Sequence, residues 1–439
     1  MSGLAEILNK EGFFVSGSDA KSSPLTEKLE HLGVLIFYGH DKSNLPRDAQ
    51  LTVYTAAVKS DNPEWIASTE RDIPMLSRAQ LLGQIMDNYS RSVAISGTHG
   101  KTTTTSMLTD IFLAAKSDPT VSVGGILSSI DGNIRVGSSD IFLTEACEYT
   151  NSFLHFYPKY ALILNIEEDH MDFFSDLSEI RHSFAAFAGQ VATDGTLLLN
   201  GDIAAPDDIT VNCVATVTRY GFDPSYEFYA QDVHFHAQDG TSFSFFQKDA
   251  FLGEIKLRVP GIHNVSNALG AAALALTMGI PFASIQLGLT SFLGTARRFE
   301  YKGELGGITI VDDYAHHPTE ISATLTAAAN YPHKRIICIF QPHTYTRTKA
   351  FLLDFAKALS AADLVILTDI YAAREKNTIG ISSADLLKEL NNYEVEAYYE
   401  PSFDAIEAFL LKKCLHGDLL ITMGAGDVYR IGEHLLGLS

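Results

Sequence analysis

The sequence predicts an α/β protein built from three domains. Apolar runs typical of strands alternate with helical patterns along the 439 residues, and this alternation is typical of sheets covered by helices. The chain is too long for one ordinary core, since domains usually hold about 100 to 200 residues. The pattern breaks near residues 88–90 and 294–298. We therefore expect domains at 1–89, 90–296 and 297–439.

The first domain is expected to be Rossmann-like. A helix at 2–10 is followed by a strand that ends at Asp19, a helix at 25–32, and strands at 34–37 and 51–55. Asp19 fits the ribose-binding acid that follows the glycine fingerprint of dinucleotide-binding folds by about 20 residues. The fingerprint would then lie at about position zero. We expect this domain to lack its first strand and Gly-rich turn.

The second domain is predicted to be an ATPase-type α/β unit. It opens with a strand at 92–96, a glycine loop and a helix from Lys101. Strands at 141–144 and 160–166 each end in acidic residues, and an Ala-rich helix follows His263. Ligands of open parallel sheets bind at the carboxyl ends of the strands. The acidic residues therefore mark the expected ligand edge.

The third domain is predicted to be a second Rossmann-like unit. Five apolar runs alternate with helical stretches beyond the break at 294–298, as expected for a doubly wound sheet. The predicted strands are 308–312, 335–340, 364–368, 394–398 and 419–423.

Charge and cysteine usage exclude several classes of protein. A formal net charge of −21 repels nucleic acid and anionic membranes, which need a basic surface. No apolar stretch is long enough to span a bilayer, and the amino terminus carries no secretion signal. We expect no nucleic-acid binding, no membrane insertion and a cytoplasmic location. Four cysteines lack metal or disulfide spacing and are expected to be free thiols: Cys147, Cys213, Cys338 and Cys414.

A glycine loop between strand and helix predicts a phosphate-binding site. Lys101 would neutralise terminal phosphates, and the Thr102 hydroxyl would reach a Mg²⁺ ion. Ile95 stands where the longer Walker pattern has its first glycine, so the loop is a shortened version. A chance Gly-Lys-Thr at a helix start is the competing explanation. The loop is Gly97-Thr98-His99-Gly100-Lys101-Thr102.

Two acidic strand ends are candidate metal sites. Glu145 follows an apolar strand and would ligate the same Mg²⁺ as Thr102; a helix cap or a solvated carboxylate is the alternative. His170 lies in the acidic run 167–172. It is a metal ligand, a general base or a partner of its acidic neighbours. The residues alone leave these three roles open.

Polar residues at the start of the Ala-rich helix suit an adenine ring. Asn264 and Asn267 each offer a donor and an acceptor beside His263. Asparagines also cap helices, and capping alone would explain them.

Two polar strand ends of the third domain predict a substrate cleft. Asp312, Tyr314 and His316 follow one strand, and His343 and Arg347 follow another. The carboxyl ends of parallel strands share one sheet edge, so these side chains are expected to face the nucleotide domain.

These blocks together resemble the Mur ligases over nearly the whole chain. The number of blocks in the same order makes coincidence implausible. The blocks that carry the resemblance are residues 1–8, 17–19, 97–105, 165–172, 261–264, 297–299, 312–318, 340–347 and 423–426.

The resemblance implies a role for each matching residue. The ATP side comprises Gly97, Thr98, His99, Gly100, Lys101, Thr102, Thr103, His263, Asn264, Asn267 and Asp312. Metal ligands are Thr102, Glu145 and His170. The substrate side comprises Ser18, Asp19, Thr55, Tyr314, His316, His343 and Arg347. Residues with catalytic roles are Lys101, His170, Arg298, His343 and Arg347, and Arg298 is the hinge arginine.

The resemblance also implies the reaction. The branch that adds L-alanine to UDP-N-acetylmuramate, with ATP and Mg²⁺, is the most similar one, and it implies an acyl-phosphate intermediate in peptidoglycan synthesis. No lysine lies between Lys159 and Lys248, which matches that branch because other Mur ligases carry a carbamylated lysine there. A ligase for a ready-made tripeptide and a non-catalytic binding module are the alternatives. Either a monomer or a homodimer is expected.

Overall fold

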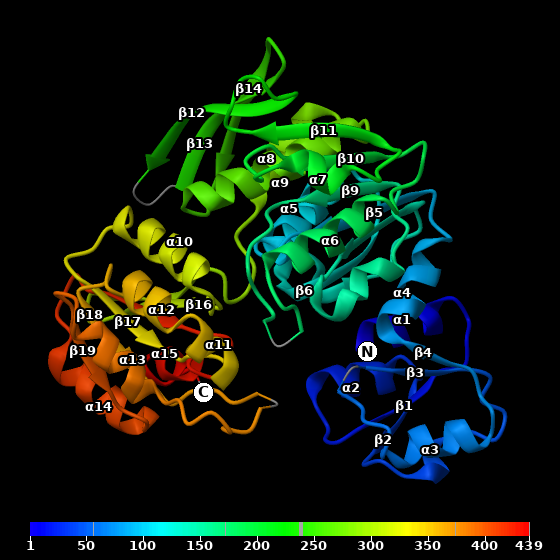
Figure 1. Cartoon of the computed structure of the whole chain (residues 1–439), viewed down its shortest axis with the longest axis horizontal. Coiled ribbons are helices and arrows are strands. Elements are labelled where there is room, and N and C mark those ends of the chain that lie inside the picture. Colours follow the sequence, from blue (N-terminus) through cyan, green and yellow to red (C-terminus); the bar gives the residue numbers. More distant parts are fainter. Residues whose placement is uncertain (56, 172, 237–239, 374, 439) are drawn as a thin grey trace.

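The chain forms three α/β units in sequence order, as predicted. The computed structural model describes residues 1–438 apart from 56, 172, 237–239 and 374. Figure 1 places the amino-terminal unit at the lower right, the central unit above it and the carboxyl-terminal unit at the lower left. The sheets change between Ser77 and Arg91 and again between Leu257 and Glu300. The boundaries at residues 90 and 297 stay predictions.

The amino-terminal unit has two separate parallel pairs instead of one sheet. β1 (Ser16–Asp19) pairs with β2 (Leu35–Tyr38), and β3 (Thr52–Tyr54) pairs with β4 (Met75–Ser77). Within the described part of the chain, neither pair joins another strand. The helices are α1 (Ser2–Lys10), α2 (Pro24–His31), α3 (Pro63–Glu70) and α4 (Arg78–Met86), with the 3-10 turn η1 (Lys42–Asn44).

Helices α1 and α4 attach this unit to the central one. Leu4 and Ile7 of α1 and Met86 of α4 are buried in the same apolar cluster as Phe142 and Phe153 of the central unit. Because buried apolar area is the main stabilising term, this shared cluster holds the two units together.

The central unit is built on a ten-stranded sheet of order β14-β13-β12-β11-β10-β9-β5-β8-β6-β7. Neighbours from β6 to β12 are parallel, and β7, β13 and β14 are antiparallel additions at the two edges. The strands are β5 (Arg91–Ser96), β6 (Thr120–Leu127), β7 (Gly132–Arg135), β8 (Ile141–Glu145), β9 (Tyr160–Ile163), β10 (Thr196–Asn200), β11 (Thr216–Gly221), β12 (Phe228–His236), β13 (Gly240–Gln247) and β14 (Ala250–Leu257).

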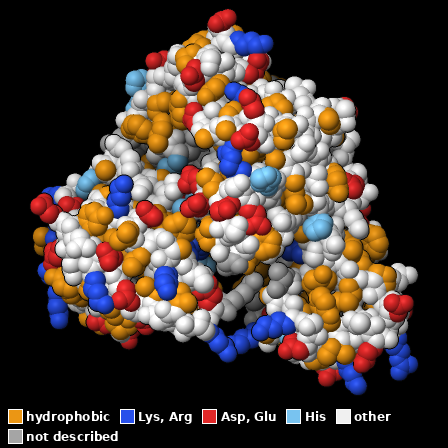
Figure 2. All heavy atoms as spheres, in the orientation of Figure 1, with side chains coloured by type: hydrophobic (Ala, Val, Ile, Leu, Met, Phe, Trp, Pro, Cys, Tyr) orange, Lys and Arg blue, Asp and Glu red, His pale blue; other side chains and the backbone are white. Residues whose placement is uncertain are grey.

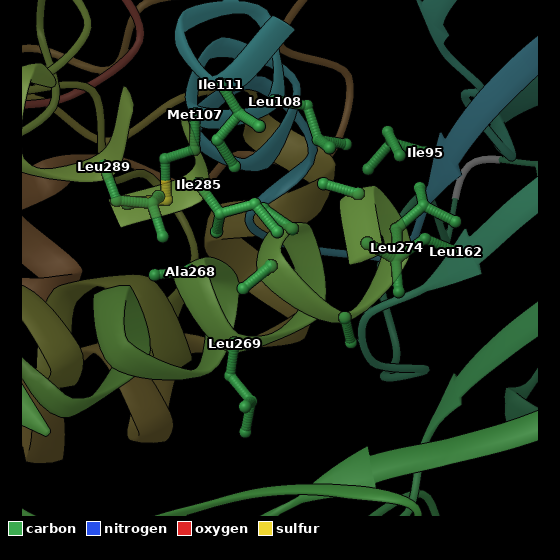
Figure 3. Close-up of a cluster of buried hydrophobic side chains, with 14 of the residues drawn as sticks. Ile95, Met107, Leu108, Ile111, Leu162, Ala268, Leu269, Leu274, Ile285 and Leu289 are labelled. Carbon is green, nitrogen blue, oxygen red and sulfur yellow. The ribbon is translucent and has the colours of Figure 1, made fainter. Parts of the chain in front are cut away.

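Helices cover both faces of this sheet. The helices and 3-10 turns are α5 (Lys101–Ala114), η2 (Ser128–Ile130), η3 (Tyr149–His155), α6 (Leu177–Ala188), α7 (Pro206–Thr210), α8 (Ile262–Thr277) and α9 (Phe282–Ser291). Figure 3 shows Met107 and Ile111 of α5 against Ile285 and Leu289 of α9, in the cluster that also buries α8. This packing anchors the start of α5, which holds the glycine loop.

The carboxyl-terminal unit is a six-stranded sheet of order β15-β16-β20-β17-β18-β19, antiparallel only at β15. Its strands are β15 (Glu300–Leu305), β16 (Ile308–Asp313), β17 (Ile336–Phe340), β18 (Leu364–Leu367), β19 (Glu396–Tyr399) and β20 (Leu419–Met423). Its helices are α10 (Pro318–Ala329), α11 (Tyr345–Ala350), α12 (Leu352–Leu359), α13 (Ser383–Leu390), α14 (Phe403–Lys413) and α15 (Tyr429–Leu436). The five predicted strands are present within two residues at each end.

One predicted strand ends early, and the reason bears on the site. β9 stops at Ile163, where a strand to residue 166 was predicted. Beyond it, Asn165 turns its hydrogen bonds to the glycine loop: its carbonyl accepts from Thr98 N at 3.2 Å and its Oδ1 accepts from His99 N at 2.8 Å. Leu164 still bonds to Ser96 at the end of β5, but Asn165 bonds to the glycine loop instead of continuing the strand.

Candidate active site

The glycine loop lies at the carboxyl edge of the central sheet, between β5 and α5. Gly97 (φ 141°) and Gly100 (φ 85°) adopt a backbone conformation that favours glycine. A Cβ at Gly97 would lie 2.9 Å from the Cβ of Leu164, and one at Gly100 would lie 2.5 Å from Asn267 Oδ1. Both glycines therefore let the loop pass tightly beside the end of β9 and beside α8.

Lys101 is held at the mouth of the loop by buried acceptors. Its Nζ donates to Glu148 at 2.9 and 3.2 Å, to the Thr98 carbonyl at 3.1 Å and to the Gly97 carbonyl. Burial opposes its charge, but Glu148 outweighs burial and raises the pKa of Lys101. A fixed ammonium at a helix start, beside the first-turn amide of Thr103, is suited to a bound phosphate.

Two predicted metal ligands meet directly. Thr102 Oγ1 donates to Glu145 Oε2 at 3.1 Å, and the Gly124 N–H donates to Glu145 Oε1. Burial raises the pKa of Glu145. Hydroxyl and carboxylate oxygens side by side are ligands that Mg²⁺ prefers.

His170 lies on the other side of Lys101. Its Nε2 is 3.7 Å from Glu148 Oε1 and 3.8 Å from Asp169 Oδ2, and its ring lies against Tyr149. Burial lowers the pKa of His170, so the ring is neutral near pH 7 and has a lone pair for a metal ion. Of the acidic run 167–172, Asp172 lies outside the described residues.

The three residues predicted for the adenine side share the first turns of α8 but differ in availability. The Asn264 amide donates to the Pro260 carbonyl at 2.7 Å, so it is engaged locally, but no side chain caps the start of α8. Asn267 faces Gly100. His263 Nδ1 is buried and has no hydrogen-bond partner among the described residues. Asn267 and His263 are thus better placed for a nucleotide than Asn264.

His263 also predicts a pH effect on stability. Burial lowers its pKa from 6.5 to about 4. Between these values the unfolded chain binds the proton and the folded chain does not, so stability falls as pH drops from 6.5 to 4. We expect His263→Gln to reduce the loss of unfolding free energy between pH 7 and 4.5 by on the order of 1 kcal/mol in urea titrations without nucleotide. An exposed control, His182→Gln, should leave the pH dependence unchanged.

The predicted substrate residues of the carboxyl-terminal unit come together. His316 Nδ1 lies 2.9 Å from the Tyr314 carbonyl, Arg347 Nη1 donates to His343 Nδ1 at 3.1 Å, and the two histidine rings are 5.5 Å apart. Burial lowers the pKa of His316 to about 4, and burial together with Arg347 does the same for His343. Both imidazoles are therefore neutral at physiological pH.

Asp312 is placed less favourably for ATP. One of its oxygens accepts from Arg297 Nε at 2.9 Å and the other from Thr422 Oγ1 at 2.6 Å. Both oxygens are therefore engaged within the carboxyl-terminal unit. Arg298, the predicted hinge arginine, lies 3.6 Å from Glu320 and over the Tyr314 ring.

Buried polar contacts join the central and carboxyl-terminal units across the site. Arg347 donates to Asp169 Oδ1 from Nη2 at 2.7 Å and from Nε at 3.2 Å. His99 of the loop lies 3.2 Å from Glu320 of α10. Charge-assisted bonds of this kind are strong when water is excluded. The glycine loop and the polar strand ends of the carboxyl-terminal unit therefore lie together in one candidate site.

Three family models match successive parts of the chain. The model described as Mur ligase family, catalytic domain, matches residues 1–90. The Mur ligase middle domain matches residues 95–275, and the Mur ligase, glutamate ligase domain, matches residues 297–426. The UDP-N-acetylmuramate–L-alanine ligase of Agathobacter rectalis is 56% identical over 436 residues, which cover 99% of this chain and 95% of that protein. The chain belongs to the Mur ligase family.

Further relatives agree with this assignment. The protein of the same name from Lachnoclostridium phytofermentans is 52% identical over an alignment that covers 99% of this Mur ligase and 95% of that protein. The crystal structure of UDP-N-acetylmuramate-alanine ligase from Thermotoga maritima superposes with a TM-score of 0.82 at 27% identity, covering 100% of this chain and 96% of that one. The three-domain fold and the resemblance inferred from the sequence are thus confirmed. The chain is an ATP-dependent ligase.

The predicted sugar-side residues of this Mur ligase lie in the amino-terminal unit. Ser18 Oγ donates to Glu64 at 2.9 Å, Asp19 ends β1 in an exposed position, and Thr55 Oγ1 accepts from the Ala57 N–H at 3.2 Å. In the part of the chain that the structure describes, no hydrogen bond or ion pair links them to Lys101. Figure 2 shows a hollow between this lobe and the carboxyl-terminal lobe.

Three acidic residues of the Mur ligase site have partners that the sequence did not predict; Glu148 and Glu320 were not named at all, and Asp169 was named only as part of the acidic run 167–172. Glu148 neutralises Lys101, Asp169 binds Arg347, and Glu320 contacts His99, His316 and Arg298. Each lies near a predicted residue: Glu148 is three positions after Glu145, Asp169 directly precedes His170, and Glu320 is four positions after His316. That proximity was the available signal. Proximity in the sequence did not reveal which lysine, arginine or histidine each carboxylate contacts.

Proposed function

We propose that this Mur ligase joins L-alanine to the lactyl carboxylate of UDP-N-acetylmuramate, using ATP. The observation that carries the proposal is the single site formed by Lys101 and the Thr102–Glu145 pair on one side and His316, His343 and Arg347 on the other. A phosphate loop facing an amine- and carboxylate-binding cleft suits phosphoryl transfer followed by amide formation. High identity to proteins named for this reaction supports the choice of substrates.

The proposed reaction has two steps. A carboxylate oxygen of UDP-N-acetylmuramate attacks the γ-phosphorus of ATP, the bond to the β-phosphate bridging oxygen breaks, and ADP and an acyl phosphate form. The L-alanine amine, after losing a proton, attacks the acyl carbon, and inorganic phosphate leaves. Lys101 stabilises the charge on the transferred phosphoryl group. We place Arg298, from the carboxyl-terminal unit, beside the same group. Orienting amine and acyl phosphate in one closed cleft supplies up to about 7 to 11 kcal/mol of the barrier reduction in favourable cases.

Mg²⁺ fits the residues present. We assign Thr102 and Glu145 to one ion and His170 to a second, because hard oxygens meet in the first group and His170 carries a neutral ring. When bound, Mg²⁺ neutralises charge on the phosphate oxygens.

His170 is open to a direct titration test. We expect His170→Ala to raise the Mg²⁺ concentration that gives half-maximal phosphate release by about tenfold, since one ligand of the second ion is lost. His182→Ala, an exposed histidine on α6, serves as the matched control and should titrate like the parent protein. If both variants show the parent Mg²⁺ dependence, His170 is not a ligand.

Amino-acid choice is the decisive test of the proposed reaction. Phosphate release and the UDP-linked product are measured with ATP, UDP-N-acetylmuramate and, in turn, L-alanine, glycine, L-serine and a tripeptide. The highest kcat/KM is expected with L-alanine. A preference for the tripeptide would instead support the alternative ligase that joins a ready-made tripeptide to the same UDP-sugar.

The proposed function also bears on the non-catalytic alternative, the location and the oligomeric state. ATP binding without amino-acid-dependent phosphate release would indicate a non-catalytic binding module instead. Within the described residues, no helix is both long and apolar enough to cross a membrane. A cytoplasmic enzyme, monomeric or homodimeric, is the form in which we propose that it acts.

A further inference from the structure

Two histidines and a glutamate meet where the phosphate loop touches the carboxyl-terminal unit. His99 comes from the loop, Glu167 from the segment after β9, and His317 precedes α10. One side-chain ligand atom from each lies within 4.8 Å of the other two. The steps of the proposed reaction use none of these three side chains.

One nitrogen of each imidazole is buried and lacks a hydrogen bond. Nε2 of His99 and Nε2 of His317 are buried and accept or donate no hydrogen bond within the described part of the chain. His317 is only 4% exposed. A buried polar atom without a partner costs about 1 to 3 kcal/mol, so two that converge on one carboxylate need an explanation.

Glu320 prepares the His99 ring for a cation. Glu320 Oε1 lies 3.2 Å from His99 Nδ1, and Glu167 Oε2 lies 3.6 Å from Nε2. Burial opposes a charge on the ring, but the two carboxylates outweigh burial and raise the pKa of His99 to about 9. A metal ion at Nε2 would therefore displace the proton on that nitrogen, while Glu320 holds the proton on Nδ1. A carboxylate behind an imidazole is the usual outer support of a metal-binding histidine. Glu167 is further held by Thr319 Oγ1 at 2.7 Å.

We propose that His99, Glu167 and His317 bind a divalent transition-metal ion of the Zn²⁺ class, bridging the central and carboxyl-terminal units. Zinc–ligand bonds of about 2.0 to 2.2 Å place tetrahedral ligand atoms about 3.3 Å apart. The observed separations therefore close by small side-chain rotations. The Glu167 side chain is 38% exposed, so the open side admits water as the fourth ligand.

Binding through His317 Nε2 requires only a small local change. The ring proton then lies on Nδ1, and the contact from the Thr319 N–H to Nδ1 is lost. That contact is 3.4 Å long, at the outer limit of a hydrogen bond. The Thr319 N–H belongs to the first turn of α10, where water is a common partner.

The chemistry of this site differs from that of the Mg²⁺ ligands. Two imidazoles and one carboxylate favour Zn²⁺, Co²⁺ or Ni²⁺, whereas Mg²⁺ prefers oxygen ligands. A bound ion would tie the phosphate loop to α10. If the proposed function holds, turnover requires these units to separate, and micromolar Zn²⁺ should then slow it.

Cobalt substitution tests the site without any substrate. The full chain is titrated with Co²⁺ in the presence of excess Mg²⁺, and the intense visible absorption of four-coordinate Co²⁺ is recorded. We expect a one-to-one signal that Zn²⁺ displaces. His317→Asn should abolish it, because asparagine keeps a helix-capping side chain but offers no imidazole. Glu320→Gln should weaken Co²⁺ binding by about tenfold or more.

The controls separate this site from its neighbours. His170→Ala and His333→Gln should retain the signal, since neither residue belongs to the cluster. Circular dichroism and thermal unfolding confirm that His317→Asn is folded, and Glu167→Gln gives a second, independent loss of a ligand. An unchanged signal in His317→Asn, its loss in His170→Ala, or no four-coordinate signal in the parent protein overturns the proposal. The Co²⁺ absorption needs no substrate. It therefore tests the metal site even if the protein shows no ligase activity.

Discussion

Replacing Lys101 by alanine is expected to lower kcat by about 10² to 10³, the usual effect of removing one preorganised charge from a transition state. The Lys101 side chain is 14% exposed and Glu148, its partner, is 2% exposed. Lys101 therefore acts where water screens it little, and no other lysine or arginine among the described residues contacts Glu148. Phosphate release with UDP-N-acetylmuramate, L-alanine and ATP measures the loss.

A lysine outside the site provides the control for this experiment. Lys159 lies just before β9, and Lys159→Ala removes an ammonium that pairs with the exposed carboxylate of Asp194. Such surface pairs contribute about 0 to 1 kcal/mol, so kcat should remain close to that of the parent. Should Lys101→Ala retain more than a tenth of the parent kcat while Lys159→Ala is normal, the phosphate role assigned to Lys101 is wrong.

Breaking the bond between Arg347 and Asp169 is expected to lower kcat/KM by about a hundredfold. The side chains are 10% and 8% exposed and belong to different units. Burial alone would raise the pKa of Asp169, but Arg347 outweighs burial and holds it below its usual range. Removing one partner leaves a buried charge unpaired, which costs about 3 to 5 kcal/mol, and the closed arrangement is lost.

A double-mutant cycle distinguishes this coupling from two separate effects. Arg347→Ala, Asp169→Asn and the double variant are compared by kcat/KM for UDP-N-acetylmuramate. We expect the double variant to be little worse than either single one, with a coupling of about 1 to 3 kcal/mol. The exposed pair Arg219–Asp207, treated in the same way, should show almost none. Additive losses for Arg347 and Asp169 would mean that their contact does not hold the units together.

The phosphate loop shows how far local pattern predicts a site. Gly97, Gly100 and Lys101 follow a buried strand and open a helix, as predicted, because the backbone freedom of glycine and the start of a helix are local properties of the chain. The end of β9 shows the limit. Residues 164–166 have the apolar composition of a strand, but Asn165 bonds the loop instead, a choice that depends on a segment 66 residues away.

The amino-terminal unit shows the same division. Strands β1, β2 and β3 were predicted within two residues, because apolar runs and turns are local signals, but β4 (Met75–Ser77) was not predicted. Their separation into the pairs β1–β2 and β3–β4 depends on which strands become neighbours. The residue pattern along one strand does not show which other strand will lie next to it.

The α/β class, the three units, the glycine loop and the family all follow from the sequence, because each depends on local pattern or on the order of motifs. The pairing of charges depends on how the chain folds: Lys101 meets Glu148, Arg347 meets Asp169, and His99 meets Glu167 and Glu320. The physical reason is that a buried charge must find a partner across folded elements. Carboxylates are numerous in a chain of net charge −21. Which of them contacts a given lysine, arginine or histidine depends on how the folded elements pack.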